Sequence, residues 1–95
     1  FSRGISLNGT DSLARNNRVR GLQPSGNGVV NAIMIQTPGS NSTIDGNQLI
    51  VPLGTSGAGI SVTLGDTNTI CRNNVIIGFS SAMINCNDAG GNTSL

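Results

Sequence analysis

The sequence predicts an all-β protein and, more narrowly, a right-handed parallel β-helix (β-solenoid) of about three and a half coils. Three observations favour this class. Gly supplies 14 of the 95 residues, and Asn, Ser and Thr make up most of the polar remainder, as is typical of turns. The apolar residues, 36% of the chain, fall in short alternating runs. Similar segments recur along the chain, and stacked repeats bury apolar side chains that one unit alone leaves exposed.

The composition excludes several classes. The charged residues are five Arg and four Asp, so Lys and Glu, which favour surface helices, are missing, and no His is present. A net charge of +1 gives no electrostatic case for nucleic acid. The only basic cluster, Arg15, Arg18 and Arg20, is interpreted as a solvated strand edge. No apolar run approaches the roughly 20 residues of a membrane span, so no membrane insertion is expected.

The chain is predicted to be a single domain over 1–95, with coils at about 4–27, 28–57, 58–81 and 82–95. Each coil begins with a short alternating strand, at 4–7, 32–35, 59–62 and 82–86. The period of two directs one set of side chains into the core and the other set outward. The inward set is Ile5, Leu7, Ile33, Ile35, Ile60, Val62 and Cys86; the outward set includes Ser6, Met34 and Ser61.

Each coil continues through a turn into a second strand of the form apolar-x-x-Asn. The strands start at Leu13, Ile44 and Ile70, which align Asn16, Asn47 and Asn73 as a stacked ladder of amides. The unequal spacings, 31 and then 26 residues, are explained by outer loops around 36–40 and 52–57. An outer loop can lengthen without disturbing the stack, so these insertions are compatible with the predicted class.

These repeats resemble the right-handed parallel β-helix repeat family, which includes pectate-lyase-like enzymes, carbohydrate-binding proteins and phage tailspikes. The segments that carry the resemblance are Gly-Ile-Ser-Leu at 4–7, Gly-Ile-Ser-Val at 59–62, Leu13-Ala-Arg-Asn16, Ile44-Asp-Gly-Asn47 and Ile70-Cys-Arg-Asn73. The resemblance covers the whole chain but implies a fold rather than a reaction. Members of the family are usually several times longer, so the chain is expected to be a short fragment of such a protein.

The candidate site is Arg15, Asp45 and Arg72. The two Arg share one position of the repeat, with Gly46 between them and Asp45 beside it, so a diagonal Arg–Asp–Arg contact on the surface is expected. Such a group can be structural or can anchor an anionic sugar. Asp11, Asp66 and Asp88 are interpreted as turn formers. No carboxylate pair stacks, so no catalytic residue, metal site or cofactor is predicted.

Cys71 and Cys86 are predicted not to bond, because the repeat directs Cys86 inward and Cys71 outward, beyond the ~7 Å that a disulfide spans between Cα atoms. The expected function is a non-enzymatic scaffold segment of an extracellular fibre, phage tailspike or virion or cell-surface protein. Its partners would be further coils of the same or a neighbouring chain, including a homo-oligomer. The alternative is a fragment of a polysaccharide-binding or polysaccharide-degrading protein.

Overall fold

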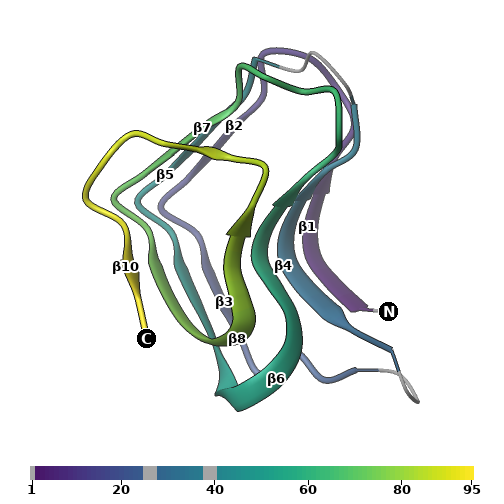
Figure 1. Cartoon of the computed structure of the whole chain (residues 1–95), viewed down its shortest axis with the longest axis vertical. Helices are drawn as coiled ribbons and strands as arrows, with labels where there is room; N and C mark the ends of the chain where they lie inside the picture. Colours follow the sequence, from purple (N-terminus) through teal and green to yellow (C-terminus); the bar gives the residue numbers. More distant parts are fainter. Residues whose placement is uncertain (1, 25–27, 38–40) are drawn as a thin grey trace.

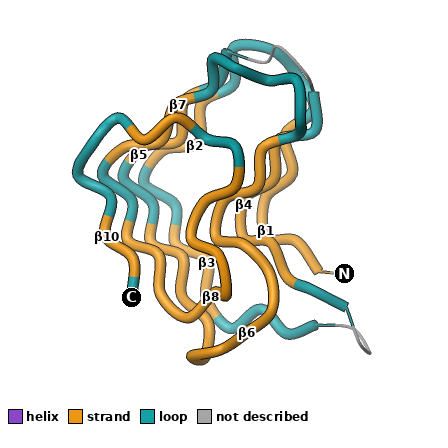
Figure 2. Tube along the Cα trace, in the orientation of Figure 1, coloured by secondary structure: helices purple, strands orange, loops and turns teal. Residues whose placement is uncertain are grey.

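The computed structural model describes residues 2–24, 28–37 and 41–95, and over these residues the chain forms strands and no helix (Figures 1 and 2). This confirms the all-β prediction. The strands are β1 (Ser2–Leu7), β2 (Leu13–Arg15), β3 (Arg18–Arg20), β4 (Val30–Ile35), β5 (Thr43–Asp45), β6 (Gln48–Val62), β7 (Ile70–Arg72), β8 (Val75–Ile84), β9 (Asn87–Asp88) and β10 (Thr93–Ser94).

All strand pairs in the described part of the chain are parallel. One sheet has six strands in the order β1-β4-β6-β8-β10, with β3 also paired to β6, and the other has four in the order β2-β5-β7-β9. Figure 1 shows β1, β4 and β6 side by side on one flank and β2, β5 and β7 side by side on the other. Parallel neighbours cannot be joined by a tight hairpin, so each connection between neighbours crosses to the other sheet.

The predicted class, a right-handed parallel β-helix of three and a half coils, is wrong. Over residues 2–24, 28–37 and 41–95 the strands form two sheets of unequal size, six and four strands, and no solenoid is found there. The predicted coil limits at 57/58 and 81/82 fall inside β6 and β8, which continue through them without a break. The sequence motif describes recurring strands, and a short all-parallel arrangement of such strands is compatible with other folds.

The core lies between the two sheets. Its fully buried residues include Ile33 and Ile60 from the larger sheet and Ile44 and Cys71 from the smaller one. The register Ile5–Ile33–Ile60 of the first strands agrees with the prediction, and Met34 and Ser61 lie on the less buried face. Burial of aliphatic side chains at about 25 cal/mol per Å² is the main contribution that holds the sheets together.

The second strands are aligned one residue away from the predicted register. Leu13 pairs with Thr43, not with Ile44, and Thr43 pairs with Ile70. The inward positions are therefore Ala14, Ile44 and Cys71, all buried, while Leu13 is 57% exposed. The prediction aligned the larger aliphatic side chains with each other, whereas the core at this place accepts the small Ala14 and Cys71.

The same shift moves the asparagine ladder. The N–H and Nδ2 of Asn17 donate to Asn47 Oδ1 at 2.9 and 3.1 Å, Asn47 donates in the same way to Asn74, and Asn74 to Asn92. The predicted members Asn16 and Asn73 lie one position outside this column. Asn47 and Asn74 are fully buried, and each also donates Nδ2 to a main-chain carbonyl, on Ala14 and Ile44 respectively. These bonds satisfy polar groups that would otherwise be costly to bury.

The predicted outer loops also differ from the structure. Residues 52–57 belong to β6, whose pairing with β8 shifts register between Ile50 and Thr55 and again between Thr55 and Ala58. The extra residues are therefore absorbed as strand irregularities of the bulge type. Of the other predicted loop, Gln36 and Thr37 follow β4, and 38–40 lie outside the described residues.

Candidate functional site

Arg15, Asp45 and Arg72 occupy the last positions of β2, β5 and β7, and they form one column across the smaller sheet. Arg15 pairs with Asp45, and Asp45 pairs with Arg72. The structure thus brings the three predicted residues together, but in a direct line. The predicted diagonal contact is wrong, because Gly46 lies one position beyond the column and Asp45 separates the two Arg.

One carboxylate oxygen receives both guanidinium groups. Asp45 Oδ2 lies 3.2 Å from Arg72 Nε and 3.8 Å from Arg15 Nε, and Asn73 Nδ2 donates to Asp45 Oδ1 at 3.5 Å. The Asp45 side chain is 15% exposed, whereas those of Arg15 and Arg72 are 55% and 42% exposed. Partly solvated pairs of this kind contribute about 0–1 kcal/mol, so the column adds little to stability.

The column is suited to contact with an anion. Both salt bridges use Nε, and over the described residues the terminal nitrogens of Arg15 and Arg72 have no further protein partner. Two guanidinium groups facing one carboxylate leave a net positive charge on an exposed strip. Planar guanidinium groups bind carboxylates and phosphates in a bidentate manner.

Asp66 and Asp88 serve their own turns. Asp66 is buried and accepts hydrogen bonds from the N–H groups of Asn68 and Thr69. Asp88 is exposed and accepts from the N–H of Gly90 and from Asn92 Nδ2. The Gly90 N–H first, and Asn92 second, lower the pKa of Asp88 from its ordinary 3.8. These contacts agree with the interpretation of both residues as turn formers.

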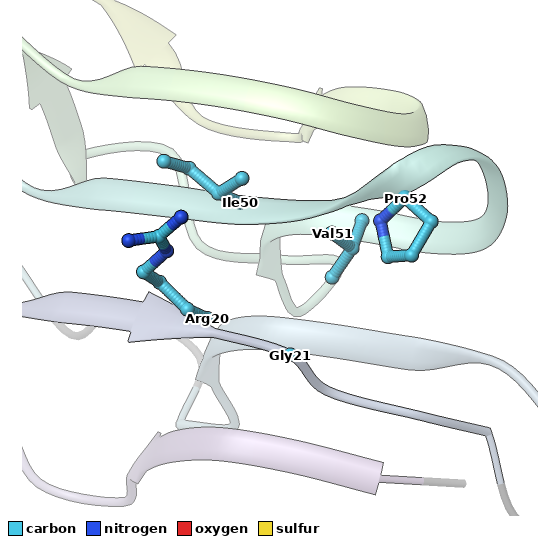
Figure 3. Close-up of a pocket in the computed structure, with 5 residues that line it drawn as sticks. All are labelled: Arg20, Gly21, Ile50, Val51 and Pro52. Atoms are coloured by element: carbon cyan, nitrogen blue, oxygen red, sulfur yellow. The ribbon is translucent and has the colours of Figure 1, made fainter.

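A shallow groove on the larger sheet was not predicted. Arg20, Gly21, Ile50, Val51 and Pro52 line it, and Figure 3 shows the Arg20 side chain extending toward the strand that carries Ile50. Its walls are mainly apolar, and Arg20 is the charged side chain among the residues that line it. No motif in the sequence marks it, because its residues come from β3 and β6, which are distant in sequence and paired in space. Over the described ranges, no group of three His, Cys, Asp or Glu side chains gathers as a metal site would require.

Cys71 and Cys86 form a disulfide, with a Cα–Cα distance of 6.1 Å, so the prediction that they do not bond is wrong. Cys71 is directed inward because of the one-residue shift. Ile84 pairs with Ser61, which places Cys86 one position beyond the predicted column of Val62, where it packs half-buried against the core. The disulfide indicates an oxidising, non-cytoplasmic environment.

Comparisons of the chain with protein-family models, curated proteins and solved structures find no match. They therefore do not bear on the resemblance drawn from the repeats. The described residues also include no helix long and apolar enough to cross a membrane.

Proposed function

We propose that the chain is a non-catalytic scaffold segment of an extracellular fibre, phage tailspike or other virion or cell-surface protein. The observation that carries the proposal is the asparagine ladder, in which the amides of four Asn, each in a turn directly before a strand, bond from one turn to the next. Such a network fixes register and satisfies the buried main chain at the same time. The ladder holds the successive turns in a fixed position relative to one another, and a scaffold requires this rigidity.

Two further features support this proposal. The disulfide joins β7 to the residue before β9, so the last strands of the smaller sheet are linked covalently. The four acids are dispersed: Asp45 ends β5, Asp88 ends β9, and Asp11 and Asp66 lie between strands. Asp66 and Asp88 already accept local hydrogen bonds. A paired acid and base, as glycoside cleavage requires, is not formed by these contacts.

The first test measures rigidity and activity together. Under non-reducing conditions the folded chain should resist trypsin for hours, because Arg15, Arg18, Arg20 and Arg72 lie within paired strands. Incubation with pectin or alginate should release no new reducing ends. Rapid cleavage of the native chain by trypsin would contradict a rigid scaffold, and polysaccharide cleavage that disappears in Asp45→Asn would establish an enzyme.

A second candidate function, polysaccharide binding, is favoured by one observation: the exposed Arg15 and Arg72 guanidinium groups on either side of Asp45. This candidate predicts that polygalacturonate binds the native chain and is lost in the Arg15→Gln/Arg72→Gln double variant. The matched control is Arg20→Gln, which removes a cation from the groove and leaves the column unchanged. Equal binding by all three proteins would show that the column is not a glycan site.

A further inference from the structure

The groove on the larger sheet has no part in either proposed function. It has a volume of about 450 Å³, and its lining residues are Arg20, Gly21, Ile50, Val51 and Pro52. Sites for small molecules have volumes of about 300–1,000 Å³ and mainly apolar walls with a few polar groups that orient the ligand. The groove has the size and the composition of such a site.

The groove lies between two paired segments of the chain. Arg20 of β3 pairs with Ile50 of β6, and the Gly21 N–H donates to the Ile50 carbonyl at 3.3 Å. Figure 3 shows the Arg20 side chain extending from its own strand toward the strand that carries Ile50. The charged group is therefore on the side of β3 that faces β6, and the groove does not depend on the opposite edge of β3.

Gly21 leaves one wall of the groove without a side chain. Its φ is 71°, a left-handed conformation that Gly adopts without strain and that most other residues avoid. No atom of the surrounding structure lies within 4 Å of the position that a Cβ would take at this residue. The space beside Arg20 is therefore open, and the main chain at this place lies at the surface.

Arg20 is a cation without an anionic partner. Over the described residues it makes no ion pair, in contrast to Arg15 and Arg72, which both contact Asp45. Its neighbours on the same face are apolar, because Ile50 pairs with Arg20 on one side and with Ile77 on the other. A planar guanidinium group can donate two parallel N–H bonds to a carboxylate, so this position is complementary to an anion with an apolar body.

We propose that the groove binds a small amphipathic carboxylate, of the class of the medium-chain fatty acids. The carboxylate accepts hydrogen bonds from the Arg20 guanidinium group, and the hydrocarbon chain lies along Ile50, Val51 and Pro52. A sugar or a phosphate needs several donors, whereas the Gly21 N–H is already bonded to the Ile50 carbonyl and one guanidinium group remains. The inference goes beyond the scaffold function and does not depend on it.

Titration of the isotope-labelled chain with octanoate, followed by NMR, tests this inference. The N–H signals of Gly21 and Val51 should shift and saturate with a Kd of about 1–10 mM, as expected for a ligand of few atoms in an open groove. Butyrate should bind at least about tenfold more weakly, because its shorter chain buries less apolar area. Octanol should bind about three- to fivefold more weakly, because it lacks the charge, and galacturonate should not shift these signals.

Two matched substitutions isolate the charge. Arg20→Gln should weaken octanoate binding about three- to fivefold. Arg18→Gln is the control, because Arg18 is exposed on the same face of the same strand but pairs with the polar Gln48. It should leave the Kd unchanged. Equal binding by the two variants would overturn the inference, and so would octanol binding as tightly as octanoate.

A second pair of variants places a competing carboxylate in the chain itself. Ile50→Asp puts a carboxylate beside Arg20 and should abolish measurable binding, whereas Gln48→Asp puts one beside Arg18 and should leave binding unchanged. Circular dichroism should show that both variants fold, and if Ile50→Asp does not fold, the two Arg variants decide the question. Octanoate shifts that are absent from the signals of residues 20–21 and 50–51 would refute the site. Such a result would leave the scaffold proposal intact, because that proposal is tested by resistance to trypsin.

Discussion

Two neighbouring columns of the structure contain asparagine for different physical reasons. The first consists of Asn16, Gly46, Asn73 and Gly91, whose φ angles are all positive, at 57°, 72°, 55° and 71°. The second is the ladder, Asn17, Asn47, Asn74 and Asn92, whose amides bond to one another. Each residue of the first column directly precedes a residue of the ladder in the sequence, so each repeat contains the pair Asn-Asn or Gly-Asn.

The first column requires a backbone conformation, and the second requires a side chain. A left-handed φ is tolerated by Gly and by Asn, and the first column accordingly alternates between these two residues. The ladder needs an amide that both donates and accepts, and all four of its positions are Asn. A recurring Asn therefore does not by itself reveal its role. The role is revealed by whether Gly can take its place in other repeats, as it does in the first column and does not in the ladder.

The largest expected effect separates the two columns by one matched substitution. Asn74→Gly leaves the N–H and Nδ2 of Asn47 without their bonds to Asn74 Oδ1 and the Ile44 carbonyl without its bond from Asn74 Nδ2, so it should lower the free energy of unfolding by about 3–5 kcal/mol. Asn73→Gly should change it by less than about 0.5 kcal/mol, because Gly tolerates the φ that Asn73 adopts. Urea unfolding of both variants measures the difference.

Asn68→Ala is a control for the loss of an exposed amide, and it should be nearly neutral because no hydrogen bond of its side chain connects strands. If Asn73→Gly proved as damaging as Asn74→Gly, the two columns would not have the separate roles assigned to them. A mild Asn74→Gly would show that the buried amides find other partners.

The sequence allowed the all-β character, the recurring strands and the alternation of the first strands to be predicted. The register of the second strands could not be predicted, because Leu13 and Ile70 are larger and more apolar than Ala14 and Cys71 and a hydrophobicity pattern favours them as core residues. One signal was available: Ala14, Ile44 and Cys71 each precede an Asn by three residues, as Leu13 and Ile70 also do. Because two repeats contain adjacent Asn, Asn16-Asn17 and Asn73-Asn74, the sequence was compatible with either residue of each pair as the partner of Asn47.

The candidate site was affected by the same ambiguity. Arg15 and Arg72 were assigned to one column correctly, because both follow the first strand residue by two in the same frame. Asp45 was assigned beside this column, since the middle repeat was shifted by one residue. The groove at Arg20 depends on pairing between β3 and β6, which local sequence patterns do not reveal. The disulfide was missed because Cys71 was assigned to the outer face.

The next largest effect concerns the last step of the ladder, where Asn92 Nδ2 donates to the Cys71 carbonyl. Replacing both cysteines by Ala opens a loop with a sequence separation of 15 residues and should cost about 3 kcal/mol. Hydrogen exchange should then show a greater loss of protection at the Asn74 N–H, which bonds to Asn92, than at the Asn17 N–H. Equal losses at both ends would mean that the disulfide stabilises the molecule only globally.

The smallest effect tests the acid at the end of the ladder. Asp88 accepts from Asn92 Nδ2 and from the Gly90 N–H, and these bonds lower its pKa below the ordinary 3.8. A carboxyl group whose folded-state pKa is lowered stabilises the fold fully above its unfolded-state pKa, and this contribution is lost as pH falls through the folded value. The urea midpoint of the native chain should therefore decrease more steeply below about pH 4 than that of Asp88→Asn. Asp11→Asn, which removes an exposed carboxylate from a turn outside the ladder, is the matched control and should keep the native slope. An Asp88→Asn variant with the native pH dependence would show that the end of the ladder does not depend on this charge.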